Sequence, residues 1–369
     1  MNYRKMDQEL LPPLDQCSSC GMCAGICPYI GYAADRVRPI YTCPLRQEGA
    51  TPSQGKDSPS VENALGCSSI SGGYCRQVCP QTAHDGKKLA AMVFGRRAPD
   101  LDFGHYQQIY FARANPAIRP QGAQYGGVVS ALAQWTLEQE WSQGVIAVSN
   151  VFPYPSPYLA TNSQELANCA GSRYLAVPSL AARLQAKQQH LDSLTIIGRP
   201  CQVTAWRRLE VLNNTIEAKS YLDSPKAALI IGLFCFWALD SAFYPWLKGR
   251  IGTLPHWMDI GPQEVILKTD QGEKRVPVDE IRPFIRPACL SCPDPTSELA
   301  DVAVGSTELD PQWNTLVIRS DRGCKLVGAA QDAGWLELKP YPAERLPILR
   351  QAVHNKKLRV IKAKEAVNQ

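Results

Sequence analysis

Leu194-Thr-Ile-Ile-Gly-Arg-Pro-Cys-Gln202 is the stretch that decides the fold class of this chain. A short apolar run followed by a Gly-Arg-Pro turn predicts a buried strand that passes directly into a helix. Further strand patterns lie on both sides of it, at residues 109–112, 145–148, 229–234, 302–304 and 316–318, with a hairpin over residues 265–278. Helical patterns begin between them at Gly126-Gly127, Asn162 and Gly323. This alternation predicts an α/β domain with a largely buried, mixed sheet.

The composition indicates a globular protein with more than one domain. The chain has 369 residues, of which 45% are hydrophobic and 20% are charged, and a domain usually takes about 100–200 residues. The net charge of +5 gives no indication of a nucleic-acid partner, although it permits docking to an acidic protein. The longest apolar run, Ala227–Leu239, is shorter than the roughly 20 residues of a membrane span, and residues 1–11 show no signal peptide. We therefore expect a cytoplasmic protein without a transmembrane segment.

Fourteen cysteines are the most informative part of the composition. Thiols in the cytosol stay reduced, so clustered cysteines in such a chain indicate metal ligands or catalytic groups. Eight of them lie in residues 1–95, ahead of the α/β pattern that extends over residues 105–340. We expect these two segments to form separate domains, followed by a basic C-terminal tail at residues 341–369 that forms a solvated, frayed helix.

The segment Cys17-Ser-Ser-Cys-Gly-Met-Cys-Ala-Gly-Ile-Cys-Pro28 has the spacing C-x2-C-x2-C-x3-C-P, which bacterial ferredoxins use to bind [4Fe–4S] clusters. Three thiolates spaced two residues apart surround one cluster in a tight turn, while the fourth cysteine points toward a neighbouring cluster. Gly21 allows the backbone to approach the sulfurs closely. The spacing therefore predicts a small ferredoxin-like iron–sulfur domain at the N-terminus.

A partial second motif, Cys75-Arg-Gln-Val-Cys-Pro80, has the spacing C-x3-C-P. In the two-cluster arrangement, the last cysteine of each motif binds the other cluster. The first cluster would then use Cys17, Cys20, Cys23 and Cys79, and the second Cys27, Cys43, Cys67 and Cys75. Cys43 and Cys67 are far apart in the sequence, so their role as ligands stays open. Zinc is the alternative, but a zinc ribbon has two separated cysteine pairs instead of three cysteines in one run.

Four further cysteines lie where strands or turns of the α/β pattern end. They are Cys201, Cys235, Cys289 and Cys292. Open α/β sheets bind ligands at the carboxyl ends of their strands, so we expect these four side chains to converge on one metal site. Taken singly, each could instead be a buried core thiol. The sequence thus predicts two [4Fe–4S] clusters and allows a third.

Seven motifs of the α/β pattern follow one another in a specific order. They are Ala123-Gln-Tyr-Gly-Gly-Val-Val-Ser-Ala-Leu132, Ala170-Gly-Ser-Arg-Tyr174, Gly198-Arg-Pro-Cys-Gln202, Gly232-Leu-Phe-Cys235, Cys289-Leu-Ser-Cys-Pro-Asp294, Ala300-Asp-Val-Ala-Val-Gly305 and Val317-Ile-Arg319. In this order and spacing the chain resembles the beta subunits of deazaflavin (coenzyme F420) hydrogenases and dehydrogenases. Relatives of that family include ferredoxin-dependent divinyl-chlorophyllide 8-vinyl reductases and 7-hydroxymethyl-chlorophyll a reductases. The chain departs from the usual family residues at Tyr125, Arg173 and Ser320, where Ser, Lys and Thr are common.

The resemblance implies a flavoprotein that binds FAD in the α/β domain and is connected to a partner by [4Fe–4S] clusters. Gly126-Gly127 would present the N-terminus of a helix to the pyrophosphate, although a glycine pair is also common in plain turns. Arg173 and Arg319 would hold a phosphate or polarise the flavin ring. The residues expected to contact FAD are Gly126, Gly127, Ser130, Gly171, Ser172, Arg173, Tyr174 and Arg319.

The cofactors implied by the resemblance convert electron pairs into single electrons, because a flavin accepts a hydride and a cluster carries one electron. Three functions stay open. They are a deazaflavin-linked oxidoreductase subunit that works with ferredoxin or a hydrogenase/dehydrogenase-type partner subunit, a ferredoxin-dependent reductase of a tetrapyrrole such as divinyl chlorophyllide, and an electron-transfer adaptor without its own substrate. The complete C-x3-C-P motif favours the first. The sequence identifies no catalytic residue and determines neither the substrate nor the direction of electron flow.

Overall fold

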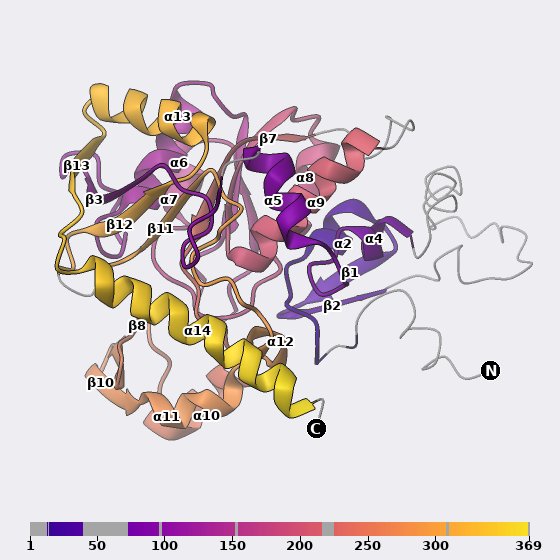
Figure 1. Cartoon of the computed structure of the whole chain (residues 1–369). Helices are drawn as coiled ribbons and strands as arrows, with labels where there is room; N and C mark the ends of the chain where they lie inside the picture. Colours follow the sequence, from indigo (N-terminus) through magenta and orange to yellow (C-terminus); the bar gives the residue numbers. More distant parts are fainter. Residues whose placement is uncertain are drawn as a thin grey trace, which may run out of the picture.

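The computed structural model is built around an eight-stranded sheet (Figure 1). It describes residues 13, 15–39, 73–95, 98–151, 154–215, 225–307 and 310–367. The strands of the large sheet are β3 (Gln108–Ala114), β4 (Gly144–Val148), β5 (Pro157–Ala160), β6 (Ser193–Gly198), β7 (Lys226–Leu233), β11 (Val302–Ser306), β12 (Asn314–Ile318) and β13 (Leu336–Pro340). They lie in the order β13-β3-β12-β11-β7-β6-β4-β5. Cys43 and Cys67 lie outside the described residues.

The large sheet is mixed, as the sequence predicts. Strands β11, β7, β6 and β4 are parallel neighbours, while β5 on one side and β12, β3 and β13 on the other pair in antiparallel fashion. The four parallel strands are buried along most of their length. This burial explains why they are continuous apolar runs in the sequence, since helices must cover both faces of a parallel sheet.

Helices cover both faces of the large sheet (Figure 1). Their bounds are Val128–Glu138 for α6, Ser163–Ala167 for α7, Ala182–Gln188 for α8, Pro200–Thr215 for α9 and Asp321–Asp332 for α13. On one face, Leu132 of α6 and Leu326 of α13 share a buried core with the strands. On the other face, Trp206 of α9 and Leu180 share a second core with Ile196 of β6. The predicted α/β architecture is therefore confirmed.

A three-stranded sheet forms a smaller lobe beside the large one. Its elements are α10 (Phe243–Ile251), β8 (Trp257–Ile260), β9 (Glu264–Thr269), β10 (Gly272–Pro277), α11 (Val278–Ile281), the 3-10 turn Arg282–Phe284 and α12 (Pro287–Leu290). Strands β9 and β10 form the hairpin predicted over residues 265–278. Met258 and Leu267 pack with Phe243 in a core of their own. The lobe positions α12, which carries Cys289, beside the segment that follows β7, where the Arg286 N–H donates to the backbone oxygen of Ala238 at 3.0 Å.

The N-terminal part of the chain forms a small unit docked on the α/β domain, which we call the cysteine-rich unit. It comprises residues 15–39 and 73–95, with α2 (Met22–Ile26), β1 (Ile30–Ala33), β2 (Arg36–Pro39), α4 (Gly73–Gln77) and α5 (Gly86–Phe94). A Cβ at Gly21 would lie 2.3 Å from the carbonyl oxygen of Pro178, and one at Gly25 would lie 2.2 Å from that of Leu180. Met22 enters the same hydrophobic core as α9. Glycine is therefore needed where the unit meets the domain.

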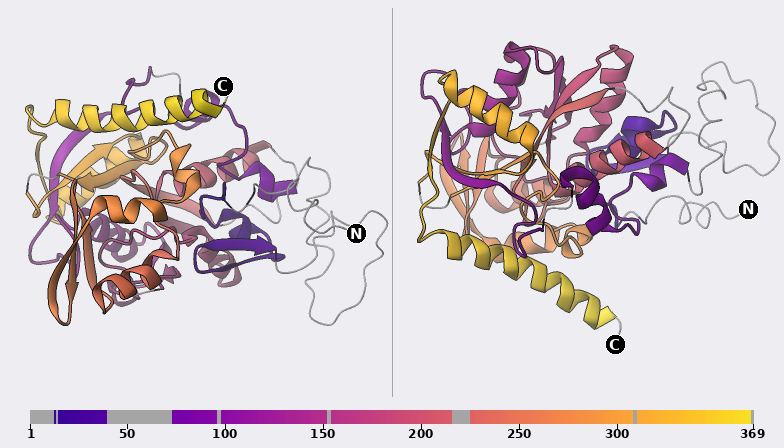
Figure 2. Two further views of the ribbon diagram at one scale, coloured as in Figure 1. Left: turned by 90° about the horizontal axis from the view of Figure 1, so that it is seen from below. Right: turned by 45° about the horizontal axis from the view of Figure 1, so that its top comes forward.

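The C-terminal segment differs from the expected solvated tail. Residues Leu346–Val367 form the helix α14, which runs along one side of the molecule and is yellow in Figure 2. Val353 and Val360 are 0% and 3% exposed, and Arg350 forms an ion pair with Asp100 at 2.9 Å. The basic residues suggested a solvated helix, but the two valines, seven residues apart, mark an inner face. In the described part of the chain, no helix is both long and apolar enough to cross a membrane.

Candidate metal centres and cofactor cavity

Four cysteines meet near the carboxyl ends of β6 and β7, and we call them the four-cysteine site. They are Cys201, Cys235, Cys289 and Cys292. Cys201 lies in the first turn of α9 directly after β6, and Cys235 follows the end of β7 by two residues. The thiols of the other three residues all interact electrostatically with that of Cys201. Burial raises the pKa of Cys235 to about 12 and that of Cys292 to about 11. Such thiols stay protonated unless a metal binds them.

Two buried cations face the four-cysteine site, and the sequence analysis missed both. Burial lowers the pKa of Arg199, but the neighbouring thiols raise it more. The thiol of Cys201 makes the largest of these contributions, and the pKa is raised overall. The second cation is Lys356 of α14, whose Nζ donates a hydrogen bond to the backbone oxygen of Cys235 at 2.6 Å. Arg199 lies at a strand end within one of the ordered motifs, and that position could have indicated it. Lys356 lies in a basic segment that carries no local signal.

The cysteines predicted for the first cluster are grouped within the cysteine-rich unit. They are Cys17, Cys20, Cys23 and Cys79. The thiol of Cys23 interacts electrostatically with those of Cys17 and Cys79. Burial, and then the neighbouring thiols, raise the pKa values of Cys20 and Cys23 well above the ordinary value. Gly21 has a φ of 86°, which glycine adopts readily, and it turns the chain between the thiols.

Two cysteines predicted for the second cluster lie beside the first group. Cys27 and Cys75 pack against the same small core as Cys23, and Cys75 interacts electrostatically with Cys23. The remaining two predicted ligands, Cys43 and Cys67, lie outside the described residues. The ligand set of the second cluster therefore stays a prediction.

The cysteine-rich unit and the four-cysteine site meet at Cys201. Its thiol interacts electrostatically with those of Cys17 and Cys20. Arg286 holds the two parts together, because it forms a buried ion pair with Asp35 and donates to the backbone oxygen of Cys17 at 3.1 and 2.7 Å. The two groups of thiols are therefore neighbours within the fold.

The candidate donors of both groups are cysteine thiols, which are the usual ligands of iron–sulfur clusters. Among the described residues, no group of three or more His, Cys, Asp or Glu side chains is placed to hold a metal ion. Around one zinc ion, all sulfurs lie about 2.3 Å from the metal. A [4Fe–4S] cluster requires a wider spacing of the sulfurs, because each thiolate binds a different iron.

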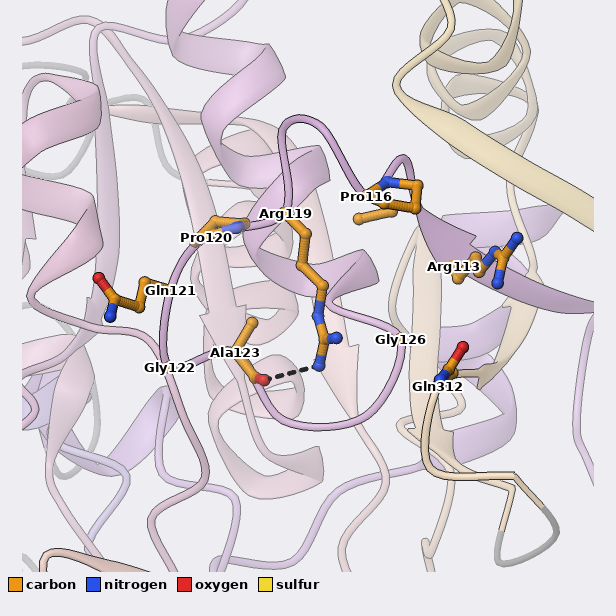
Figure 3. Close-up of a pocket in the computed structure, with 10 residues that line it drawn as sticks. Arg113, Pro116, Arg119, Pro120, Gln121, Gly122, Ala123, Gly126 and Gln312 are labelled. Carbon is orange, nitrogen blue, oxygen red and sulfur yellow. Dashed lines mark hydrogen bonds between the residues drawn. The ribbon is translucent and has the colours of Figure 1, made fainter.

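A cavity of about 480 Å³ opens beside the start of α6 (Figure 3). Its wall includes Arg113, Arg119, Gly122 and Gly126. Figure 3 shows the Arg119 side chain extending across the loop toward Ala123, to whose backbone oxygen it donates at 2.9 Å. The cavity has the size of a small-molecule site, roughly 300–1,000 Å³, and arginine gives part of its wall a positive charge.

Close contacts explain the glycine pair at the start of α6. A Cβ at Gly126 would lie 2.8 Å from both the backbone oxygen of Ala112 and Oδ1 of Asn314. Gly127 is the N-cap residue and has a φ of 73°, in the left-handed region that favours glycine. Oδ1 of Asn314 accepts a hydrogen bond from the Val128 N–H at 3.3 Å. The pair thus sets the N-terminal end of α6 at the carboxyl edge of the sheet.

The turn at residues 171–174 lies between this cavity and the four-cysteine site. Gly171 has a φ of 98°, and a Cβ there would lie 3.3 Å from the backbone oxygen of Gly122 in the cavity wall. The backbone oxygen of Tyr174 accepts from the N–H of Leu239 at 2.8 Å, four residues after Cys235. Two adjacent segments therefore carry most of the predicted FAD contacts: Gly126, Gly127, Ser130, Gly171, Ser172, Arg173 and Tyr174.

Asp259 of β8 joins these two segments, and no sequence motif indicated it. Its carboxylate accepts from the hydroxyl of Tyr125 at 2.9 and 2.8 Å and from that of Tyr174 at 2.8 Å. Burial, and then the charge of Asp259, raise the pKa of Tyr174, so the hydroxyl stays a donor. Gln124 adds a further link, because its Oε1 accepts from the N–H of Ser172 at 2.6 Å. Tyr125 thus has a specific partner here, although the resembled family commonly has Ser at this position.

The two arginines predicted to contact FAD donate to protein oxygens. Arg173 donates to the backbone oxygen of Ser172 at 2.6 Å. Arg319 is 1% exposed and donates to the backbone oxygens of Phe103 at 2.6 Å and Thr296 at 2.9 Å. It follows the end of β12 that is remote from the cavity. The structure does not bring Arg319 to the cavity wall, and its contact with FAD stays a prediction.

Comparisons with known proteins agree with the resemblance seen in the sequence. Two family models match the chain, described as the N-terminal and C-terminal parts of the coenzyme F420 hydrogenase/dehydrogenase beta subunit, at residues 109–183 and 191–344. The coenzyme F420 hydrogenase subunit beta of Methanococcus voltae is 28% identical over 65% of this chain and 86% of its own length. A subunit of the F(420)H(2) dehydrogenase of Methanosarcina mazei is 24% identical over 93% of this chain and 90% of its own length.

A solved structure has a similar fold. It is a chain of the F420-reducing [NiFe] hydrogenase complex from Methanosarcina barkeri, with a TM-score of 0.67 and 24% identity, covering 73% of this chain and 95% of that chain. The two family models span the cavity and the four-cysteine site, but neither the cysteine-rich unit nor α14. The match to the Methanosarcina mazei protein covers 93% of this chain and so extends into the cysteine-rich unit.

Proposed function

Because the chain belongs to the family of coenzyme F420 hydrogenase/dehydrogenase beta subunits, we propose that it is an iron–sulfur flavoprotein subunit that passes electrons between coenzyme F420 and a partner protein. One observation carries this proposal: the two groups of cysteines meet at Cys201. Clusters in both groups would lie close to one another inside the protein. Single electrons would then pass between them without crossing solvent.

FAD would occupy the cavity beside the start of α6. When bound, FAD would exchange a hydride with the deazaflavin and exchange single electrons with the clusters. Arg119 and the positive N-terminal end of α6 would hold its pyrophosphate, and Gly127 would let the backbone approach it. Asp259 would keep the loop and the turn at residues 171–174 in place around it.

The clusters would form a series that leads away from the cavity. The four-cysteine site would hold the cluster nearest FAD, and Cys17, Cys20, Cys23 and Cys79 would hold the next one. Cys27 and Cys75 would contribute to a further cluster with Cys43 and Cys67. The outermost cluster would exchange electrons with the partner, which would be ferredoxin or a hydrogenase/dehydrogenase-type subunit.

Anaerobic purification followed by analysis of iron, acid-labile sulfide and flavin tests this proposal. We expect about eight or more irons per chain, at about four per cluster, with an equal amount of sulfide, and non-covalently bound FAD. Reduced coenzyme F420 should bleach the flavin and cluster absorption, whereas NADH, as the control donor, should not. Zinc without sulfide, or a flavin that reduced coenzyme F420 leaves oxidised, would contradict the proposal.

A further inference from the structure

The helix α14 brings a side chain to the four-cysteine site from outside the matched family region. The family models end at residue 344, whereas α14 covers Leu346–Val367. The inner face of α14 buries Val353 and Val360, and the helix contacts α12, which carries Cys289. This docking therefore lies outside the region that the family models match.

Lys356 lies where α14 meets the four-cysteine site. The residue is 3% exposed. Its Nζ donates to the backbone oxygens of Cys235 at 2.6 Å and Asp294 at 2.8 Å, and it approaches Sγ of Cys292 at 3.8 Å. An ammonium group has three donors, and these three contacts use all of them. Each contact is with the four-cysteine site or with the segment that directly follows it.

Within the described part of the chain, the charge of Lys356 has no carboxylate partner. The carboxylate of Asp294 instead accepts the N–H groups of Thr296 and Glu298. The next residue, Lys357, does have such a partner, because its Nζ pairs with Glu298 at 2.8 Å. Burying an ammonium group is costly unless an opposite charge lies close to it. The carboxylate of Asp294 acts electrostatically on Cys292 but forms no ion pair with Lys356. The thiols can supply the missing charge, because they become negative when they bind a metal.

Arg199 is the second buried cation at this site. Among the described residues, Arg199 forms no ion pair with a carboxylate, and its Nη2 donates to the backbone oxygens of Ser19 and Val177. Two such cations beside four thiols match a bound group with a net negative charge. A [4Fe–4S] cluster with four thiolate ligands is a group of this kind.

Building on the proposed function, we propose that Lys356 acts through its charge and raises the reduction potential of an iron–sulfur cluster held by the four-cysteine site. Taking up one electron adds one negative charge to the cluster, and a fixed cation close by stabilises the added charge. The contact of Nζ with the sulfur of Cys292 acts in the same direction. The electron comes from the reduced flavin in the working protein and from dithionite in the test.

The test is a redox titration of the purified, cluster-loaded protein with dithionite, followed by EPR spectroscopy. Lys356→Met should lower the midpoint potential of one cluster, and Lys356→Arg should keep that potential near its original value. Lys362→Met is the matched control, because it removes the same charge from an exposed position of the same helix, and it should change no potential. An unchanged set of potentials in Lys356→Met would overturn the proposal.

Iron content distinguishes an effect of the charge of Lys356 from an effect of its packing. It also distinguishes a failure of this inference from a failure of the proposed function on which it rests. If Lys356→Met loses the iron of one cluster, retention of that iron in Lys356→Arg supports a role for the charge. Loss in both variants would assign the effect to packing and overturn the proposal. Cys289→Ser tests the underlying function by itself. If this variant keeps all the iron of the unchanged protein, the four-cysteine site holds no cluster and the proposed function fails as well.

Discussion

Cys201 is the residue on which the candidate electron path depends. It belongs to α9 by sequence, yet its thiol interacts with thiols of the cysteine-rich unit and of the four-cysteine site. Cys169 provides a contrast. Burial raises its pKa to about 12, and Arg173 is its charged neighbour. Cys201 is therefore a candidate metal ligand, whereas Cys169 has the features of an ordinary buried thiol.

Replacing each of these cysteines by serine separates the two roles. Cys201→Ser should lose about four irons per chain, because a cluster needs all of its thiolates. Cys169→Ser should keep the full iron content and lose only about 1–2 kcal/mol of stability, as usual for one buried substitution. Iron and sulfide assays on both purified variants provide the comparison. Full iron content in Cys201→Ser would show that this residue is no ligand.

Asp301 is a buried residue with a structural role. It is 1% exposed, and its two carboxylate oxygens accept from Arg207 at 3.0 Å and Arg322 at 2.7 Å. Asp301→Asn should destabilise the fold by up to about 3–5 kcal/mol, because it removes the buried carboxylate shared by Arg207 and Arg322 and leaves Arg207 with Glu210 alone. Glu337→Gln is the control, since it removes a surface ion pair worth about 0–1 kcal/mol. Thermal unfolding of both variants measures the difference, and equal midpoints would contradict this role.

The carboxylate of Asp301 should also make the stability of the fold depend on pH. Burial opposes ionisation of Asp301, but Arg207 and then Arg322 outweigh it and lower the pKa below the ordinary value. A lowered pKa in the folded state stabilises the fold above the ordinary aspartate pKa of about 3.9. This contribution should be lost as the pH falls below about 4. Unfolding midpoints measured across that range should fall less in Asp301→Asn than in the unchanged protein, and parallel curves would contradict the prediction.

In the large sheet, the sequence predicted the six strands that lie between the two edge strands. Strands β4, β6, β7 and β11 are continuous apolar runs because both of their faces are covered. Strands β5 and β13 were not predicted, since they are short edge strands of four and five residues. The docking of α14 was not predicted either, because only the tertiary structure shows what its inner face packs against.

The start of α6 provides the prediction that concerns a single element. Gly127 and Gly334 both have positive φ values, 73° and 75°, but only Gly127 lies beside Arg119 and the cavity. Gly127→Asp should weaken FAD binding by at least about tenfold, roughly 1.4 kcal/mol, because its carboxylate would repel the pyrophosphate. Gly334→Asp imposes a similar backbone strain in open space and should keep its FAD. Flavin content per chain, measured after denaturation, decides between them, and equal content would reject this placement of the cofactor.

For the candidate sites, the local spacing of residues in the sequence was informative, whereas contacts of Lys356 and Asp259 with distant segments left no local signal. The C-x2-C-x2-C motif predicted the grouping of Cys17, Cys20 and Cys23, because a tight turn alone brings them together. Lys356 and Asp259 reach their positions only through the packing of distant elements, so no local pattern could indicate them. Arg319 shows the opposite case, since a motif position suggested a cofactor contact while the fold places the side chain among buried backbone oxygens.

Taken together, the parts of the molecule predict an order of electron transfer. The cavity adjoins the turn at residues 171–174, which adjoins the segment after Cys235. The four-cysteine site in turn meets the cysteine-rich unit at Cys201. A cluster at the four-cysteine site would therefore be the only link in this series between FAD and the clusters of the cysteine-rich unit.

Removing a ligand from each of two successive clusters in this series tests the order. In Cys289→Ser, reduced coenzyme F420 should still reduce the flavin, but the clusters of the cysteine-rich unit should stay oxidised because the connecting cluster is missing. In Cys20→Ser, the flavin and the cluster of the four-cysteine site should both be reduced, because the break lies beyond them. Rapid mixing followed by optical and EPR spectroscopy distinguishes the two patterns. If the outer clusters of Cys289→Ser were reduced at the rate of the unchanged protein, electrons would have to enter the cysteine-rich unit by another route, and the contact at Cys201 would serve only to hold the two parts together.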